Sequence, residues 1–572
     1  MKFGKLINFW PLIILIIISL LTITPFLHSG FFPVHDDTQV QRVFEMRKAL
    51  SDGMFPVRWV PDLGYGYGYP VFNFYAPLPY YIGGFIALAG IDVLLATKIM
   101  IAGVVFGSSF SMYLLAKEFW GKLGGLLSGI LYLFAPYHAL NAYIRGDVGE
   151  LYAYFFIPLI FFGIWKYYKD QKFRYFLIGS LSYAGLITSH NLSAMMTTPL
   201  IFLIILILIY KKRNFSLLLI PLLGILVSSF YSFPAFLEKE YTNVMRIIGM
   251  NAEYREHFVC PIQLWDSLWM FGGSALGCVD GLSFRIGKLH IIGSIVAFGL
   301  ALFFIKKERQ KSLIVISAVA LLLVSVFLLL DSSISIWRLV PYMNFFQFPW
   351  RFLLLVSFFS SFLGGSIIFF ISKISLNQKQ KLFIPVISLL LIILPVVVYQ
   401  KLFVPKEYLN KTDEDYINKD YLNFETSKIS DEYMPKSFKT PKVREEIFRE
   451  KIRGQNINVT NVSEKTNRLS ANIHVKEDTT VLVHIPYFPA WKYYINGSPI
   501  EVSEIGVGVS FRLKKGTSKF LAKFEQTPIE KMANLLTLSG ITLIVAGIIY
   551  GRKSRQPIGP LARRVKLNET QR

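Results

Sequence analysis

Two adjacent carboxylates, Asp36 and Asp37, follow His35 shortly after an apolar run at 10–27. Acidic side chains so close to hydrocarbon are costly unless they pair, bind a ligand or take part in chemistry. One carboxylate is enough to cap a following helix, because it accepts hydrogen bonds from the first backbone N–H groups. The second therefore favours a functional pair, in which one member draws a proton from a hydroxyl group as a general base.

The residues after the acid pair predict a helix that lies along a membrane surface, with one of the two aspartates as its N-cap. Val40, Val43, Phe44 and Arg47 follow the i, i+3, i+4, i+7 spacing of one helix face. This spacing predicts an apolar stripe toward the bilayer with a positive charge at its edge.

Further polar side chains stand at the predicted outer ends of apolar spans. Arg145, Asp147 and Glu150 cluster in one turn, where Asp147 can serve as a ligand-binding carboxylate or as a helix N-cap. His190 lies in a second turn, where a polar residue is also expected without any function. Arg351 lies just inside a span, where its guanidinium can grip a phosphate or extend to the interface.

The stretch GYGYGY at 64–69 alternates glycine with tyrosine. It is not a phosphate-binding loop, because no GK[ST] sequence follows and no strand precedes it. The alternation is typical of an aromatic belt at the membrane interface, or of rings that stack on sugars.

The elements that must position these residues are membrane helices. The chain has 572 residues, of which 53% are hydrophobic and 16% aromatic, and its mean hydropathy is +0.46. Apolar runs of about 20 residues recur, and this length crosses a bilayer as a helix. The first run fits a retained anchor better than a signal peptide, since no small-residue cleavage site follows it. The candidate spans are 10–28, 98–116, 122–139, 151–168, 174–189, 192–210, 215–235, 288–305, 312–330, 350–372, 382–402 and 529–550. The apolar piece 77–90 either spans or re-enters, so about 12–13 spans are expected.

The net charge of +23 is interpreted as an orientation signal, and no nucleic-acid partner is expected. Basic residues gather in short loops between spans and in the tail at 551–572, which places these segments and both termini in the cytoplasm. The loops 29–76 and 236–287 are then extracytoplasmic. The second loop holds Cys260 and Cys278, which outside the cell form a disulfide or remain two free thiols.

A soluble insertion at 403–528 precedes the last span. Its first part is polar and rich in turn residues. From about 445 onward, apolar and polar residues alternate with the period of a strand, and Asn496-Gly497 is a hairpin signal. The pattern predicts a small antiparallel β-sandwich outside the membrane.

Several stretches resemble bacterial membrane proteins described as 6-pyruvoyl-tetrahydropterin synthase-related. They are the acid pair followed by SDGMFPVRWVPDLGYGYGYPVFNFYAPLPYY, then RGDVGE, SHNLSAMM and FQFPWRF. The segment YFPAWKYYINGSPIEV and the sequence after it resemble YfhO-type membrane proteins. The pterin label implies no pterin chemistry here, because soluble pterin synthases bind zinc through histidines and no such triad is recognisable. The wider resemblance is to GT-C glycosyltransferases.

The GT-C resemblance implies a multi-span enzyme that takes a sugar from a polyprenyl-phosphate carrier, by hexosyl or pentosyl transfer. Such enzymes carry an acid pair in their first outer loop, and by this likeness Asp36 takes the first position and Asp37 the second. Some GT-C enzymes also use a divalent metal ion, for which Asp36, Asp37 and Asp147 offer oxygen ligands. No other cofactor is implied. The candidates for substrate binding are His35, Arg145, Asp147, Glu150, His190 and Arg351.

The expectation is an inverting glycosyltransferase of the bacterial plasma membrane that acts on the outer face. Its partners are the lipid bilayer, a polyprenyl-phosphate-linked sugar, and a glycan, lipid or protein acceptor. One alternative is a transporter or flippase of lipid-linked precursors, which predicts charges within spans and inverted repeats. Another is a non-catalytic envelope assembly protein, for which deletion of 403–528, and not a change of the aspartates, removes function.

Overall fold

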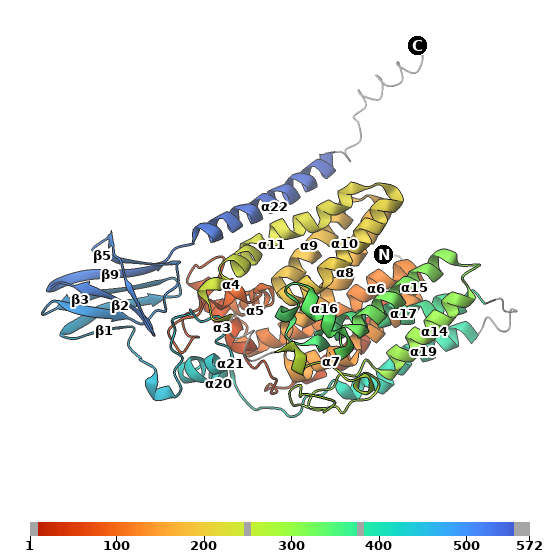
Figure 1. Cartoon of the computed structure of the whole chain (residues 1–572), viewed down its shortest axis with the longest axis horizontal. Coiled ribbons are helices and arrows are strands. Elements are labelled where there is room, and N and C mark those ends of the chain that lie inside the picture. Colours follow the sequence, from red (N-terminus) through yellow and green to blue (C-terminus); the bar gives the residue numbers. More distant parts are fainter. Residues whose placement is uncertain (1–9, 245–252, 375–382, 554–572) are drawn as a thin grey trace, which may run out of the picture.

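The computed structural model describes residues 10–244, 253–374 and 383–553. They form a bundle of apolar helices with a β-sandwich at one end, and a long last helix lies along the bundle (Figure 1). Of the basic tail predicted at 551–572, the residues after Lys553 lie outside the described part of the chain.

The helices of the bundle are α2 (Trp10–Ile23), α3 (Gln39–Ser51), α4 (Val71–Phe74), α5 (Leu78–Leu88), α6 (Val93–Leu133), α7 (Pro136–Leu140), α8 (Val148–Asp170), α9 (Phe173–Ser189), α10 (Asn191–Lys212), α11 (Leu219–Leu237), α13 (Pro261–Trp265), α14 (Lys288–Phe303), α15 (Arg309–Phe327), α16 (Ile334–Leu339), α17 (Leu353–Ile371) and α19 (Phe383–Tyr399). The helices of the C-terminal part are α20 (Asp413–Ile417), α21 (Ser427–Ile429) and α22 (Pro528–Lys553).

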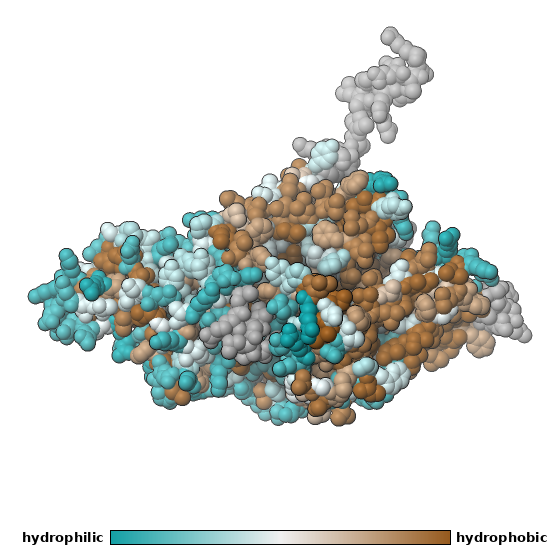
Figure 2. All heavy atoms as spheres, viewed as in Figure 1, coloured by the Kyte–Doolittle hydropathy of each residue, from teal (hydrophilic) through white to brown (hydrophobic). Residues whose placement is uncertain are grey.

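The prediction of a polytopic helical membrane protein is confirmed. Within the described residues, nine helices are long and apolar enough to cross a membrane. Two further predicted spans correspond to α9 and α14, which have only 17 and 16 residues. Figure 2 shows the apolar surface of the helices on one side of the molecule and the polar surface of the β-sandwich on the other.

Helix α6 contains two predicted spans, 98–116 and 122–139. Its backbone leaves helical geometry at Gly121, with φ 76° and ψ −177°. A Cβ added to Gly129 would lie 2.8 Å from the carbonyl oxygen of Ser109, although 20 residues of straight helix extend about 30 Å. The two halves of α6 therefore lie side by side as a hairpin, as two separate spans require.

Helices α3 and α5 pack against each other inside the protein. A Cβ on Gly83 of α5 would lie 2.7 Å from Val43 of α3, and one on Gly84 would lie 2.7 Å from Met46. The prediction that Val43 faces the bilayer is therefore wrong, because α5 covers that face. The expected aspartate N-cap is also wrong, since Thr38 occupies this position and makes no side-chain capping bond. With 11 residues, α5 rises about 17 Å, too short to cross about 30 Å of hydrocarbon.

Basic loops that are far apart in the sequence meet at one end of the bundle. Lys166 pairs with Glu118 at 3.2 Å, and Lys311 Nζ donates to the carbonyl oxygen of Phe119 at 2.7 Å. The segments 117–122, 166–174 and 306–311 therefore share one end. The N-terminus of α8, the α9–α10 turn, the C-terminus of α11 and the N-terminus of α17 lie at the other ends of these helices.

The C-terminal part folds as the predicted antiparallel β-sandwich. Its strands are β1 (Ile452–Gly454), β2 (Ile457–Lys465), β3 (Arg468–Val475), β4 (Thr479–Val483), β5 (Trp491–Ile495), β6 (Ser498–Pro499), β7 (Ser503–Ile505), β8 (Gly508–Leu513) and β9 (Gly516–Phe524). One sheet has the order β1-β4-β8-β7 and the other β2-β3-β9-β5-β6. Phe511 and Phe520 stack between the sheets with ring centroids 5.6 Å apart. Asn496 and Gly497 form the β5–β6 turn with φ of 50° and 84°, as predicted for a hairpin.

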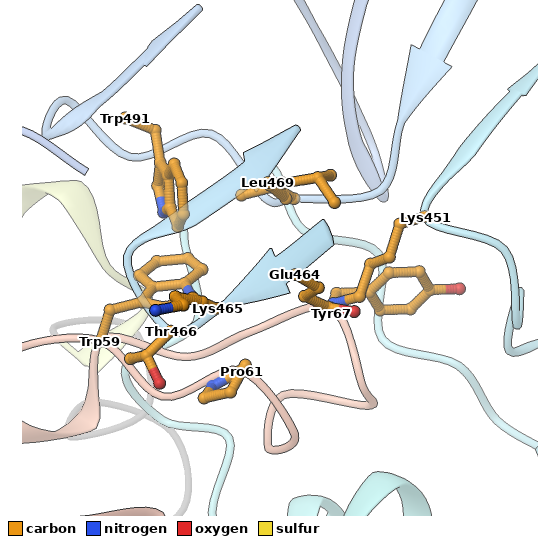
Figure 3. Close-up of a pocket in the computed structure, with 10 residues that line it drawn as sticks. Trp59, Pro61, Tyr67, Lys451, Glu464, Lys465, Thr466, Leu469 and Trp491 are labelled. Atoms are coloured by element: carbon orange, nitrogen blue, oxygen red, sulfur yellow. The ribbon is translucent and has the colours of Figure 1, made fainter. Parts of the chain in front are cut away.

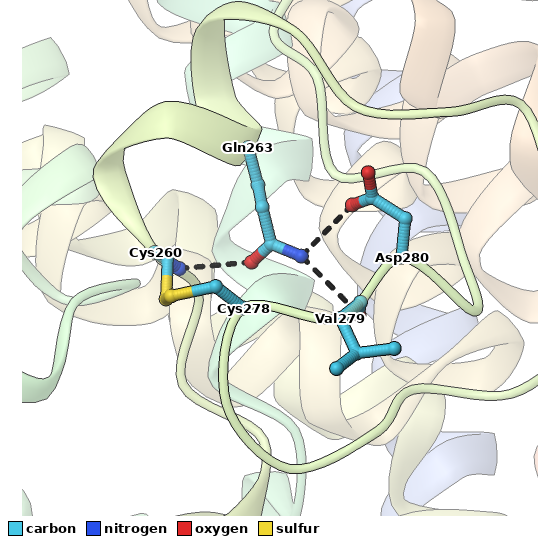
Figure 4. Close-up of a disulfide and its surroundings, with 5 residues drawn as sticks. All are labelled: Cys260, Gln263, Cys278, Val279 and Asp280. Atoms are coloured by element: carbon cyan, nitrogen blue, oxygen red, sulfur yellow. Dashed lines mark hydrogen bonds between the residues drawn. A yellow bond between two sulfur atoms is a disulfide. The ribbon is translucent and has the colours of Figure 1, made fainter.

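Cys260 and Cys278 form a disulfide that closes one loop, with their Cα atoms 5.5 Å apart (Figure 4). Gln263 reinforces this loop. Its side-chain oxygen accepts from the backbone N–H of Cys260 at 3.0 Å, and its amide nitrogen donates to Asp280 at 2.9 Å. The loop before α14 is thus held by one covalent and several polar links.

Candidate functional site

A cavity of about 390 Å³ lies at the end of the bundle opposite the basic loops. This volume is in the range of small-molecule sites. Six parts of the chain line it: the segments around α3 and α4, the start of α8, the α9–α10 turn, the end of α11 with the residues after it, the segment before α17, and residues 429–433. The lining residues are Asp36, Thr38, Arg42, Phe74, Tyr75, Ala76, Asp147, His190, Asn191, Leu192, Ala235, Lys239, Val244, Phe345, Gln347, Arg351, Ile429, Ser430, Glu432 and Tyr433.

Asp36 is held at the cavity by backbone pairing with the turn before α8. The backbone N–H of Asp36 donates to the carbonyl oxygen of Arg145 at 2.9 Å, and Gln39 Nε2 donates to that of Gly146 at 2.8 Å. Burial and the charge of Asp147 raise the pKa of Asp36, against the opposing effect of Arg145 and two other arginines. A carboxylate with a raised pKa is a stronger proton acceptor once it is ionised.

Asp37 points away from the cavity. Its carboxylate lies beside Tyr421 and Lys411, and it is not among the cavity-lining residues. Burial raises the pKa of Asp37, and the nearby Lys411 charge and the Tyr421 hydroxyl oppose that rise. The structure therefore separates the two acids, with only Asp36 facing the cavity.

A network of buried charged side chains lies next to the cavity, at the start of α8. Arg145 pairs with Asp147 at 2.7 Å and with Glu150 at 3.0 Å, and Arg351 lies 3.8 Å from Glu150. Asp147 also caps α8, because its carboxylate accepts from the backbone N–H of Glu150 at 2.9 Å. Burial acts to raise the pKa of Asp147, but the nearby Arg145 and Arg351 charges outweigh it, so the pKa lies below its usual range.

His190 joins this network from the α9–α10 turn. Its Nδ1 accepts from the backbone N–H of Ser193 at 3.2 Å, which caps α10. Burial lowers the pKa of His190, although Asp147 and Glu150 oppose the shift, so the imidazole is neutral near pH 7. Because Nδ1 is the acceptor, the proton of the neutral imidazole lies on Nε2, which can donate a hydrogen bond to a substrate hydroxyl.

The predicted metal set of Asp36, Asp37 and Asp147 does not come together, because Asp37 faces Tyr421. Within the described parts of the chain, a different group has metal-ligand spacing: Asp147, Glu150 and His190 offer atoms within 4.8 Å of one another. Both carboxylates of this group already pair with Arg145. The group therefore fits a charge-balanced network better than a cation site.

The other predicted site residues take different places. His35 is exposed, and its Nε2 lies 3.1 Å from the carbonyl oxygen of Phe271, outside the cavity lining. Arg145 and Glu150 are buried behind the wall and do not line it. The cavity itself brings together Asp36, Asp147, His190 and Arg351, which all line it.

Residues 429–433 form a wall that no sequence pattern predicted. Ser430 accepts from Arg42 at 2.8 Å and donates to Glu432 at 3.1 Å, and the Arg42 guanidinium lies 4.1 Å from the ring centroid of Tyr75. These residues lie in a polar, turn-rich segment without periodicity, so only contacts with α3 could reveal them. The sequence did not single out Arg42 either, because it is one of several charged residues in a helix predicted to lie on the membrane surface.

The glycine–tyrosine stretch 64–69 positions this wall. Of the two alternatives for its tyrosines, an interface belt or rings that stack on sugars, neither fits their buried side chains. Tyr65, Tyr67 and Tyr69 are at most 2% exposed. The Tyr69 hydroxyl accepts from the backbone N–H of Tyr433 at 3.1 Å, and the Tyr65 hydroxyl donates to Asp431 at 3.3 Å. The tyrosines therefore hold residues 429–433 in place beside the cavity.

A second hollow lies where the 29–76 segment meets the β-sandwich (Figure 3). Its walls include Trp59 and Trp491, whose rings meet edge to face at 5.6 Å. The hollow has a volume of about 10 Å³, which is room for about one water molecule. It is a packing feature of the junction and too small for a substrate.

Comparison with known proteins places the chain in a family. A family model described as "6-pyruvoyl-tetrahydropterin synthase related domain; membrane protein" matches residues 72–403. The chain belongs to this family. The match ends before the wall at 429–433 and begins after Asp36, so two sides of the cavity come from outside the family domain.

Other known proteins are similar over parts of the chain. An uncharacterized protein from Lactococcus lactis subsp. cremoris is 27% identical over 338 residues, which are 56% of this chain and 54% of that protein. The chain thus spans about half the length of this curated relative. Among solved structures, the Archaeoglobus fulgidus oligosaccharyltransferase in the apo form has a TM-score of 0.42 and 13% identity over 77% of this chain and 61% of its own. ArnT from Cupriavidus metallidurans, bound to undecaprenyl phosphate, has a TM-score of 0.41 and 13% identity over 73% and 76%.

Proposed function

We propose that the chain is an integral membrane glycosyltransferase that moves a sugar from a polyprenyl-phosphate donor to a cell-envelope acceptor on the outer face. One observation carries the proposal: a partly buried carboxylate, Asp36, faces a substrate-sized cavity that also presents the cations Arg42, Lys239 and Arg351. This pairing of a proton acceptor with cations suits transfer from an anionic leaving group.

In the proposed reaction, the carboxylate of Asp36 accepts the proton of an acceptor hydroxyl as its oxygen attacks C1 of the sugar. The bond from C1 to the lipid phosphate breaks, and the phosphate leaves with the electron pair. Attack from the face opposite the phosphate inverts the configuration at C1. Arg351 is placed to stabilise the departing phosphate, since its Nε and one terminal nitrogen have no hydrogen-bond partner among the described residues.

The orientation follows from charge. The basic segments 117–122, 166–174 and 306–311 share the end opposite the cavity. Basic short loops favour the cytoplasmic side, and this supports the proposal that the cavity and the β-sandwich lie on the outer face of a bacterial plasma membrane. A glycan, lipid or protein acceptor of the cell envelope can reach it there.

The test compares membranes that carry Asp36→Asn or Asp37→Asn for sugar transfer from polyprenyl-linked donors to envelope acceptors. Loss of a general base lowers the rate by about 10²–10⁴-fold, so Asp36→Asn should nearly abolish transfer. Asp37→Asn should retain it within about tenfold, because Asp37 faces Tyr421 and supplies no proton acceptor to the cavity. Undiminished transfer by Asp36→Asn contradicts the proposal and favours a transporter or an assembly protein.

A further inference from the structure

Lys239 is a cavity-lining cation that has no acidic partner within the described residues. Its Nζ lies 4.3 Å from the ring centroid of Phe236 and 5.3 Å from that of Phe345. The other two cations of the cavity have polar neighbours, since Arg42 donates to Ser430 at 2.8 Å and Arg351 lies 3.8 Å from Glu150 without a hydrogen bond from its Nε. Two aromatic faces hold the Lys239 ammonium in place without neutralising it.

The position of Lys239 joins the cavity to the apolar outer surface of the bundle. It follows α11 by two residues. Phe236 and Leu237, at the end of α11, are 59% and 46% exposed, and Leu222 on the same helix is 51% exposed. Helix α11 belongs to a segment with the length and hydropathy of a membrane span, so we expect these side chains to face acyl chains. A charge at this point lies where a lipid headgroup would meet the cavity.

Aromatic rings of the segment before α17 contact both Lys239 and Arg351. Lys239 rests on Phe345, and the guanidinium of Arg351 lies 5.4 Å from the ring centroid of Phe348. Gln347, between these rings, also lines the cavity. One stretch of seven residues, 345–351, therefore supports an uncompensated cation at the apolar edge and a partly compensated one deeper inside.

We propose that Lys239 binds the phosphate of an anionic isoprenoid lipid, whose tail lies along Phe236 and Leu237. The ammonium offers three donors to a phosphate, and in the described parts of the chain no carboxylate forms an ion pair with it. This inference rests on the proposed glycosyltransferase function, in which the lipid is the donor. Lys239 captures the headgroup at the rim, and Arg351 meets the same phosphate as it leaves.

The experiment measures binding of undecaprenyl phosphate to the purified full-length protein in phosphatidylcholine nanodiscs by native mass spectrometry. The variants are Lys239→Gln, Lys239→Arg and the control Lys436→Gln. Lys436 is exposed, pairs with Glu240 at 3.3 Å, and lies outside the cavity lining. Undecaprenol and inorganic phosphate serve as two further ligands, which separate the tail from the headgroup.

The expected result is a Kd for undecaprenyl phosphate at least about tenfold weaker in Lys239→Gln, since a hydrogen bond to a charged group is worth about this factor. Lys239→Arg and Lys436→Gln should bind within about threefold of the wild type, and the loss in Lys239→Gln should shrink at high salt. Undecaprenol should bind weakly and equally to wild type and Lys239→Gln. Wild-type affinity in Lys239→Gln overturns the inference, as does equal Lys239-dependent binding of inorganic phosphate alone.

The two proposals fail separately. If Lys239→Gln binds the lipid normally while Asp36→Asn abolishes transfer, the Lys239 site is wrong and the glycosyltransferase stands. If lipid binding depends on Lys239 while Asp36→Asn transfers sugar normally, the lipid site stands and the proposed chemistry is wrong.

Discussion

Asp36 and Asp147 face one cavity, and in the proposed reaction burial and repulsion from Asp147 together determine the pH range in which Asp36 can act as a base. Burial and the charge of Asp147 raise the pKa of Asp36. The reactive carboxylate therefore forms only as the pH rises through that raised value, and transfer should fall toward acid pH. Asp147 remains ionised throughout, because its own pKa lies below the usual range.

Asp147→Asn should move the acid limb of the transfer rate to lower pH. The substitution removes the negative charge that raises the pKa of Asp36, and it leaves Arg145 without one of its partners, which lowers that pKa further. Asparagine still caps α8. The measurement is the pH dependence of kcat/KM in both proteins, with Asp37→Asn as the control whose acid limb stays in place. An acid limb that stays or rises in Asp147→Asn would show that Asp147 does not act on Asp36.

At the scale of elements, one glycine decides whether α6 can turn back on itself. Gly121 has φ of 76° and ψ of −177°, a backbone conformation that residues other than glycine rarely adopt. A Cβ added there meets no heavy atom within 4 Å, so any cost of a substitution comes from the backbone alone.

Gly121→Ala should destabilise the protein by about 1–3 kcal/mol, the usual cost of such a backbone conformation. Gly103→Ala is a matched control, since it lies in the same helix with helical backbone and also has no heavy atom within 4 Å of an added Cβ. Alanine favours a helix by up to about 1 kcal/mol over glycine, so the control should be neutral or stabilising. Thermal unfolding in detergent measures both; equal midpoints for the two variants would contradict the hairpin geometry at Gly121.

At the scale of the whole molecule, a buried polar network joins the N-terminal segment to the last helix. Arg58 donates to Asn73 at 2.6 Å and to the carbonyl oxygen of Phe230 at 2.9 Å, and lies 3.7 Å from Glu530 of α22. Asn73 in turn donates to Glu238 at 2.9 Å. The two acids and Arg58 are at most 1% exposed, so the network holds the helix that follows the β-sandwich against α11.

Arg58→Met should destabilise the protein by about 3–5 kcal/mol, because removal of one partner leaves buried carboxylates uncompensated. The control is Lys288→Met, which breaks an exposed pair with Asp266 at 3.1 Å and should cost less than about 1 kcal/mol. Chemical unfolding in detergent, followed by tryptophan fluorescence, compares the two. A loss in Arg58→Met no larger than that of the control would mean that the network does not tie the last helix to the bundle.

Local patterns were sufficient for the elements. Apolar runs at membrane length predicted the helices, and alternation with a turn at Asn496-Gly497 predicted the β-sandwich, because both periodicities arise within one segment. The patterns failed at α3, where Val43 meets α5 and not lipid. An apolar stripe has the same spacing whether lipid or protein covers it.

The candidate site shows the same division between local and long-range information. The sequence by itself predicted a polytopic membrane protein with a β-sandwich. It also identified a group of polar and charged residues near the ends of spans, among them Asp36, Asp147, His190 and Arg351. Only the tertiary structure turned Asp36 toward the cavity and Asp37 toward Tyr421. Adjacent residues in a turn have nearly identical sequence context, so the packing of distant segments decides which one meets a substrate. The same is true of Lys239 and the wall at 429–433, which contribute to the cavity through contacts across hundreds of residues.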